Sequence, residues 1–186
     1  MAEKRQLMSD FASCTVRRWR SGVERYLDTA PGSHEAEDMA KRLSVDTCLA
    51  SGEMAFEEPL YRAAAYEAMY RIKFVKEGVS DFSTIAPLDY AQAVAGGDGA
   101  LVAAQTALRR LADCAVRHGP VEARKLILSP IGGPKEAAAF STITPFISSC
   151  MTHDVTVTFS KISLRGYIGE ALYRLSIAAQ RNAGMG

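Results

Sequence analysis

The sequence lacks long apolar runs, a strong net charge and an abundance of histidine. No stretch approaches the roughly 18 apolar residues that a bilayer-spanning helix needs, so no transmembrane segment is predicted. The formal net charge is +1, so no overall field favours nucleic acid, a membrane surface or an acidic substrate. The chain begins with charged residues and shows no apolar core of a signal peptide. We therefore expect a cytoplasmic protein or a trimmed, mature form.

Histidine is scarce and irregularly placed. The three histidines are His34, His118 and His153, and none has a carboxylate or a cysteine at a spacing that we interpret as a ligand set. His153 follows Cys150 by three residues, but a nucleophilic cysteine is not favoured there. The sequence therefore predicts no metal, no cofactor and no catalytic residue.

The chain contains nearly the same pattern twice. Residues 11–74 and 111–177 share a skeleton at offsets of 100 in the first part and 102 to 103 in the second. Shared pairs include Cys14/Cys114, Arg17/Arg117, Cys48/Cys150, Arg62/Arg165, Glu67/Glu170 and Tyr70/Tyr173. We interpret this order as an internal duplication with a pseudo-twofold axis. It predicts a first unit at 1–76, a connector at 77–98 and a second unit at 99–186, forming one globule or two apposed subdomains.

The cysteines follow the repeat. There are 33 residues between Cys14 and Cys48, and 35 between Cys114 and Cys150. Four cysteines allow three connectivities, and the repeat favours one disulfide within each unit. The alternative is that all four are buried thiols that pack as small apolar groups. Disulfides persist in oxidising compartments, which favours a periplasmic or secreted protein over a cytoplasmic one.

Each unit has the periodicity of four helices, so the fold class is all-α. One short extended segment is expected in each unit, at 53–56 and at 156–159. Pro145 should kink or break the third helix of the second unit. The connector is expected to carry a short helix from Pro87 to Ala95 and to pack on the body of the protein through its apolar residues.

The last helix of each unit carries the polar pattern Arg-x4-Glu-x2-Tyr-Arg, as Arg62, Glu67, Tyr70, Arg71 and as Arg165, Glu170, Tyr173, Arg174. The glutamate and the final arginine are four residues apart, which predicts an intrahelical ion pair. The first arginine lies at the margin of the apolar stripe and must bond to carbonyls or a carboxylate. We favour an arginine that ties the helix to a loop. The alternative is a pair of ligand-binding arginines. The tyrosines are expected to pack, with hydroxyls that need a partner.

Three functions stay open at this point. The first is a non-enzymatic interaction or structural module with an unidentified protein partner. The second is a small-ligand-binding protein with an apolar cavity between helices, gated by Arg62 or Arg165. The third is an enzyme of an unrecognised type. Nucleic acid is not expected as a partner, and a homo-oligomer is left open.

Several local elements are shared with a known group of proteins. They are Cys14, the sequence Pro31-Gly32-Ser33, Cys48, Cys150 and the segment 164–173, with its Leu-Arg-Gly and Glu-Ala-Leu-Tyr sequences. On these elements the chain resembles a group of uncharacterised bacterial proteins that are often exported. The resemblance implies export and assigns no activity.

Overall fold

The computed structural model describes residues 2–44, 46–48, 57–78, 81–90, 99–151 and 160–184. Within these ranges the chain is all-α, as the sequence predicts, with seven α-helices, one short 3-10 helix and no strand. The helical elements are α1 (Ala2–Leu27), α2 (His34–Leu43), η1 (Asp46–Cys48), α3 (Glu58–Phe74), α4 (Gly99–His118), α5 (Pro120–Leu128), α6 (Pro134–Ser149) and α7 (Lys161–Ala183). The segments 53–56 and 156–159, predicted to be extended, lie outside the described residues.

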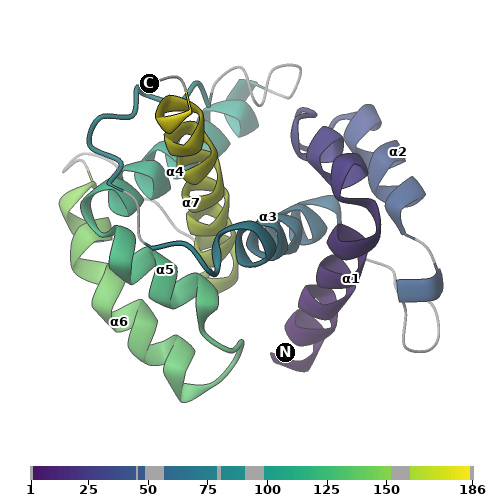
Figure 1. The fold of residues 1–186 in the computed structure, drawn as a ribbon, viewed down its shortest axis with the longest axis horizontal. Coiled ribbons are helices and arrows are strands. Elements are labelled where there is room, and N and C mark those ends of the chain that lie inside the picture. Colours follow the sequence, from purple (N-terminus) through teal and green to yellow (C-terminus); the bar gives the residue numbers. More distant parts are fainter. Residues whose placement is uncertain are drawn as a thin grey trace.

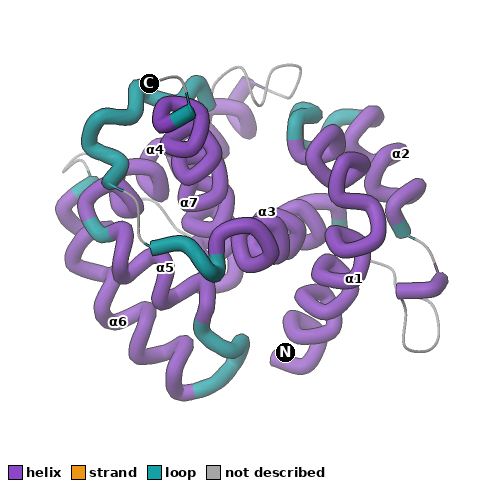
Figure 2. The backbone as a smooth tube through the Cα atoms, in the orientation of Figure 1, coloured by secondary structure: helices purple, strands orange, loops and turns teal. Residues whose placement is uncertain are grey.

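Helices α3 and α7 form the centre of the molecule. α3 packs against α1 and α7, and α7 packs against α4 and α5 as well. Figure 1 shows α3 crossing the middle of the molecule between α1 and α7, and Figure 2 shows how little of the described chain is loop. The helical period predicts one apolar stripe on each of these helices, made of Tyr61, Ala65, Ala68, Met69 and Ile72 on α3 and of Leu164, Ile168, Ala171, Leu172 and Leu175 on α7. Both stripes are buried, apart from a half-buried Ile72. A Cβ atom at Gly166 would lie 2.7 Å from the Cβ atom of Ala63, so glycine allows the two central helices to approach closely.

A backbone kink occurs at the same relative place in both halves. Trp19 bends α1, with φ −135° and ψ 48°, and Gly119 separates α4 from α5, with φ −132° and ψ 59°. Non-helical backbone at Trp19 divides α1 into two helical parts, and the second part, which ends at Leu27, corresponds to α5 in the second half.

The turns after α1 and after α5 also correspond. Each contains a glycine with a left-handed backbone, Gly32 with φ 74° and Gly132 with φ 77°. Residues with a Cβ atom rarely adopt this conformation, so glycine is suited to both turns. The next helix then begins, and Ser33 caps α2 by accepting a hydrogen bond from the Ala36 amide at 3.1 Å.

The helices that precede the later cysteine of each half have different lengths. α2 ends at Leu43, so Cys48 lies beyond it in η1, whereas Cys150 is the residue at which α6 ends. Pro145 does not break α6, which continues through it. Pro145 and Ser141 are both on the exposed face of α6, where water can bond the carbonyl group that lacks an amide partner.

The described part of the connector packs on the body, as its apolar residues predict. Phe82, Ile85 and Tyr90 are buried. Arg117 on α4 holds the segment by donating from Nη1 to the carbonyl oxygens of Phe82 at 2.9 Å and Ile85 at 2.6 Å. The predicted helix is wrong over residues 87–90, which are not helical, and the remainder of that helix lies outside the described residues.

Candidate functional site

Arg62 ties the beginning of α3 to the loop after α1. Its Nη1 atom donates to the carbonyl oxygens of Leu27 at 3.2 Å and Thr29 at 3.1 Å, and Nη2 donates to Thr29 Oγ1 at 2.9 Å. Its Nε atom donates to Glu58, four residues earlier on α3, at 2.6 Å. Burial opposes the charge, but Tyr26 and Glu58 hold the pKa of Arg62 above its ordinary value. Arg62 therefore remains a cation in a buried position.

Arg165 makes the corresponding connection in the second half. Its Nη2 atom donates to the carbonyl oxygens of Ile127 at 3.2 Å and Ser129 at 3.1 Å, and Nη1 donates to Ser129 Oγ at 3.1 Å. It also donates from Nε to both carboxylate oxygens of Glu67 and from Nη1 to Glu136 at 2.8 Å. The residue is 1% exposed. Burial opposes its charge, and the two carboxylates keep the pKa of Arg165 above its ordinary value.

The two arginines are thus bound to equivalent loop atoms. Leu27 and Ile127 each supply a carbonyl oxygen, and Thr29 and Ser129 each supply a carbonyl oxygen and a hydroxyl. All three guanidinium nitrogens of each arginine are bonded to protein atoms. In this arrangement the guanidinium groups hold helices to loops, and no open edge is left that would face a ligand.

The two repeated glutamates have different partners. Glu67 accepts from Arg165 on α7, whereas Glu170 accepts from Arg109 on α4, with Nε 3.1 Å and 3.0 Å from its two oxygens. Arg109 is 4% exposed and lies 61 positions from Glu170 in the sequence. The sequence interpretation missed this pair, because no local spacing links an arginine to a glutamate at that distance.

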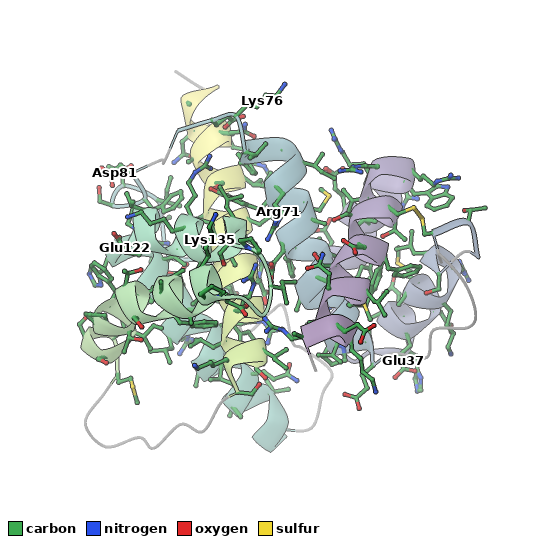
Figure 3. All side chains as sticks on the ribbon, turned by 90° about the horizontal axis from the view of Figure 1, so that it is seen from below. Glu37, Arg71, Lys76, Asp81, Glu122 and Lys135 are labelled. Carbon is green, nitrogen blue, oxygen red and sulfur yellow. A yellow bond between two sulfur atoms is a disulfide. The ribbon has the colours of Figure 1, made fainter. Side chains whose placement is uncertain are left out.

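Arg71 is the second cation beside Glu67, after Arg165. It lies 3.7 Å from Glu67 across one helical turn, as the spacing of four predicts. Its Nη2 atom also donates to the carbonyl oxygens of Ile127 and Ser129. Burial lowers the pKa of Arg71, Glu67 opposes this shift, and Arg165 adds to it. Figure 3 marks Arg71 on the side of α3 that faces the helices of the second half.

Glu136, at the beginning of α6, connects this network to the N-terminal end of the chain. Its carboxylate accepts from Arg5 on α1 at 2.5 Å, from Arg165 at 2.8 Å and from the amide of Gly132 at 2.8 Å. Burial favours the neutral carboxyl group, but these three donors outweigh it and lower the pKa of Glu136 to about 2. Side chains from both halves therefore meet at one ionised carboxylate.

The repeated tyrosines are packed, and their hydroxyls differ. Tyr70 accepts a hydrogen bond from Arg124 on α5 at 2.8 Å. The Tyr173 hydroxyl has no hydrogen-bond partner among the described residues. Its ring centroid lies 5.8 Å from that of Tyr66, whose hydroxyl donates to the Leu27 carbonyl at 3.1 Å. Burial, with a contribution from nearby carboxylates, raises the pKa of Tyr173 to about 12.

A half-open groove of about 570 Å³ lies between α1, α3 and α7. Tyr66 and Tyr173 lie on its inner surface together with apolar side chains. Its lining residues are Glu24, Leu27, Asp28, Tyr66, Lys73, Leu88, Tyr173, Arg174, Ile177, Ala178, Gln180 and Arg181. Neither Arg62 nor Arg165 is among them, so these arginines do not gate this space.

The two walls of this α1–α7 groove carry opposite charges. Glu24 lies in the last turn of α1 and Asp28 directly follows that helix, whereas Arg174 and Arg181 come from α7 and Lys73 comes from α3. Glu24 and Asp28 are close enough to raise the pKa of Tyr173, and Arg181 is close enough to oppose that rise. Such a surface can bind a ligand with both a positive and a negative group.

The structure brings together the cysteine pairs that the repeat favours. The sulfur atoms of Cys14 and Cys48 are at bonding distance, 2.09 Å, and those of Cys114 and Cys150 are 1.99 Å apart. The Cα atoms are 5.6 Å and 5.9 Å apart, within the usual range for disulfides. The first bridge joins α1 to η1, and the second joins α4 to the end of α6.

One histidine lies against the second bridge. His118 Nδ1 is 3.5 Å from the sulfur of Cys114 and 3.6 Å from that of Cys150. The sequence interpretation missed this cluster. A signal was present in the spacing, because residues four positions apart lie on one face of a helix, and both Cys114 and His118 belong to α4. His34 lies on α2, and His153 lies outside the described residues.

Comparison with protein-family models, with curated proteins and with solved structures finds no match for this chain. Among the described helices, none has the length and apolar character that crossing a bilayer requires. The function has therefore to be argued from the geometry of the chain itself.

Proposed function

We propose that the protein is a non-enzymatic interaction module that binds a peptide segment of a partner protein in the α1–α7 groove. The observation that carries the proposal is the arrangement of charge, with Asp28 on one wall and Arg181 on the other, both exposed. A peptide segment that carries both an acidic and a basic side chain complements these walls.

The shape of the groove favours a peptide over an enclosed ligand. A small-molecule site usually buries most of its ligand in a largely apolar cavity. This groove is half-open and five of its lining residues are charged, so it does not enclose a ligand on all sides. Leu88 and Ile177, both half-buried in the lining, offer apolar surface for an apolar side chain between the charges.

The buried arginines are not part of the proposed binding surface. Arg62 and Arg165 are 4% and 1% exposed and are bonded to loop carbonyls and carboxylates. We assign to them, with Glu67 and Glu170, the task of holding α3 and α7 in place. The groove then has fixed walls, which lowers the entropic cost of binding.

We further propose that the two halves, 1–76 and 99–186, arose by duplication and are related by a pseudo-twofold axis, with 77–98 as the connector. The matched kinks at Trp19 and Gly119 and the matched turns at Gly32 and Gly132 support this. The groove then lies where the two copies meet, since α1 and α3 belong to the first and α7 to the second.

We also propose that the protein works in an oxidising compartment, either the periplasm or outside the cell. Two cysteine pairs at disulfide distance support this, because such bonds are reduced in most cytoplasms. The resemblance to bacterial proteins that are often exported points the same way.

A second candidate function is the binding of a free zwitterionic small molecule. The specific observation in its favour is the volume, since about 570 Å³ falls within the range of small-molecule sites. This candidate would be favoured if amino acids or dipeptides raise the melting temperature of the protein while no peptide from the library binds.

The test is selection from a random peptide library on the oxidised, full-length chain, followed by calorimetric titration of the enriched peptides. The groove variant Asp28→Lys with Arg181→Glu inverts one exposed charge on each wall and leaves the net charge unchanged. We expect peptides with both charges to be enriched and to bind this variant at least about tenfold more weakly.

The matched control is Glu37→Lys with Arg110→Glu, which makes the same exchange on exposed residues of α2 and α4. Figure 3 marks Glu37 on α2, beyond α1 from α7. This control should bind as the unaltered protein does. Equal weakening of both variants, or enrichment of no peptide, would count against the proposal.

A further inference from the structure

Three side chains at the second bridge have the composition of a zinc-binding set. They are Cys114 and His118 on α4 and Cys150 at the end of α6. We propose that, once the Cys114–Cys150 bond is reduced, these three residues bind a zinc ion, with water as the fourth ligand. This site is distinct from the α1–α7 groove and does not depend on peptide binding.

The distances fit a tetrahedral zinc ion. With Zn–S bonds of about 2.3 Å and Zn–N bonds of about 2.05 Å, tetrahedral angles place sulfur and nitrogen about 3.6 Å apart. The observed separations from His118 Nδ1 are 3.5 Å to Cys114 and 3.6 Å to Cys150. Both nitrogen–sulfur distances therefore already match those of a zinc site. Only the two sulfur atoms have to move apart after the bond between them is cleaved.

The local structure positions the three ligands without any large rearrangement. Cys114 and His118 are four residues apart on α4, so both project from one face of the helix. Cys150 is held beside them because α6 packs against α4. His118 is exposed and the two cysteines are half-buried, so an ion can reach the site from solvent.

The chemistry balances with a dithiol as the reductant. The dithiol gives two electrons and two protons to the disulfide, becomes a disulfide itself and leaves Cys114 and Cys150 as thiols. Zn²⁺ then binds two thiolates and the neutral imidazole, and two protons are released to solvent. The same two sulfur atoms serve the bridge and the metal, so the two states exclude each other.

The first bridge provides an internal comparison. The residue four positions after Cys14 is Arg18, a cation that cannot bind a metal ion. The inference therefore applies to the second pair only. It predicts that two bridges at equivalent places behave differently once they are reduced.

The experiment uses the full chain, reduced with a phosphine, desalted without oxygen and titrated with Co²⁺ and then Zn²⁺. We expect one Co²⁺ per chain with a thiolate-to-cobalt charge-transfer absorption, displaced by Zn²⁺. The oxidised chain should show no such band. The variant Cys14→Ser with Cys48→Ser should keep the band, and Cys114→Ser with Cys150→Ser should lose it.

A histidine pair separates ligation from folding. His118→Gln replaces an exposed side chain, and His34→Gln is the matched control on an exposed histidine of α2. Loss of a second-shell partner commonly costs 10- to 100-fold in metal affinity, so loss of the ligand itself should cost at least about tenfold. His34→Gln should bind as the unaltered chain does. Equal affinity in both variants, or no cobalt band in the reduced chain, would overturn the proposal, whether or not reduction loosens the fold.

Discussion

Arg165 on α7 and Glu67 on α3 form a buried ion pair although they are 98 positions apart in the sequence. The Nε atom of Arg165 lies 3.0 Å and 3.1 Å from the two carboxylate oxygens, and Nη2 lies 2.9 Å from one of them. Because the same guanidinium also bonds Ile127 and Ser129, the pair joins the two central helices to the end of α5. This contact fixes the position of α7, and with it one wall of the α1–α7 groove.

Replacing Arg165 by methionine should strongly destabilise the protein. Methionine has nearly the side-chain volume of arginine, so the change removes the charge without opening a large cavity. The carboxylates of Glu67 and Glu136 stay buried without this cation, and the loss of one partner of a buried ion pair typically costs about 3–5 kcal/mol. Urea denaturation measures the free energy of unfolding directly. Arg110→Met, at an exposed position of α4, should change it by less than about 0.5 kcal/mol. A loss below about 1 kcal/mol at Arg165 would show that the network carries little stability.

Stability should fall in acid partly through Glu136. Its pKa in the folded protein is about 2, below the ordinary value of 4.5, so the folded state favours the ionised form. The resulting stabilisation is fully present above about pH 4.5 and is lost as the pH falls toward 2. Glu136→Gln, which removes this titration, should be less stable than the unaltered protein at pH 7, and the difference should shrink across this window. A difference that stays constant from pH 7 to pH 2 would contradict the assignment.

The approach of α3 and α7 should be sensitive to one methyl group at Gly166. Gly166→Ala brings two Cβ atoms to 2.7 Å, and overpacking of this kind costs about 1–3 kcal/mol. Within a helix, alanine is otherwise more stabilising than glycine by about 1 kcal/mol. A lower free energy of unfolding for Gly166→Ala would therefore identify the steric clash. Adding Ala63→Gly should make the double variant more stable than the sum of the single changes predicts.

Gly78 is the control for this substitution, because a Cβ atom there meets no atom within 4 Å. Gly78→Ala should leave the midpoint of thermal unfolding nearly unchanged. If Gly166→Ala proves neutral or stabilising, the two central helices are not as close as described.

Each disulfide should contribute separately to stability. The bridges close loops of 34 and 36 residues, and the chain-entropy relation gives about 4 kcal/mol for each. Replacing either pair by alanine should lower the free energy of unfolding by an amount of that order. Intact mass before and after reduction and alkylation should show two bonds, and peptide mapping should place one in each half. A bond between the halves would contradict the fold.

The sequence predicts the features that depend on local spacing. The apolar stripes of α3 and α7 and the all-α class were predicted, and the structure confirms them. The cysteine pairs also lie where the repeat favours them. The bond between Arg62 and Glu58 was not predicted, although the two residues are four positions apart on α3, a spacing that places them on one face of the helix.

Other features depend on tertiary contacts and leave no local signal. Arg109 reaches Glu170 only because α4 packs against α7. The effect of Pro145 depends on which face of α6 is exposed, and a proline on the solvent side is tolerated. The groove arises where three helices meet, so its residues share no motif.

The most direct measurement of peptide binding in the α1–α7 groove is an NMR titration of the oxidised, ¹⁵N-labelled chain with an enriched peptide. We predict that the amide shifts cluster on the groove, at Asp28, Lys73, Arg174, Ile177 and Arg181, and that Asp28→Lys with Arg181→Glu abolishes them. Shifts that gather instead along α2 or α6, with the groove amides unmoved and the variant binding normally, would contradict the proposed function.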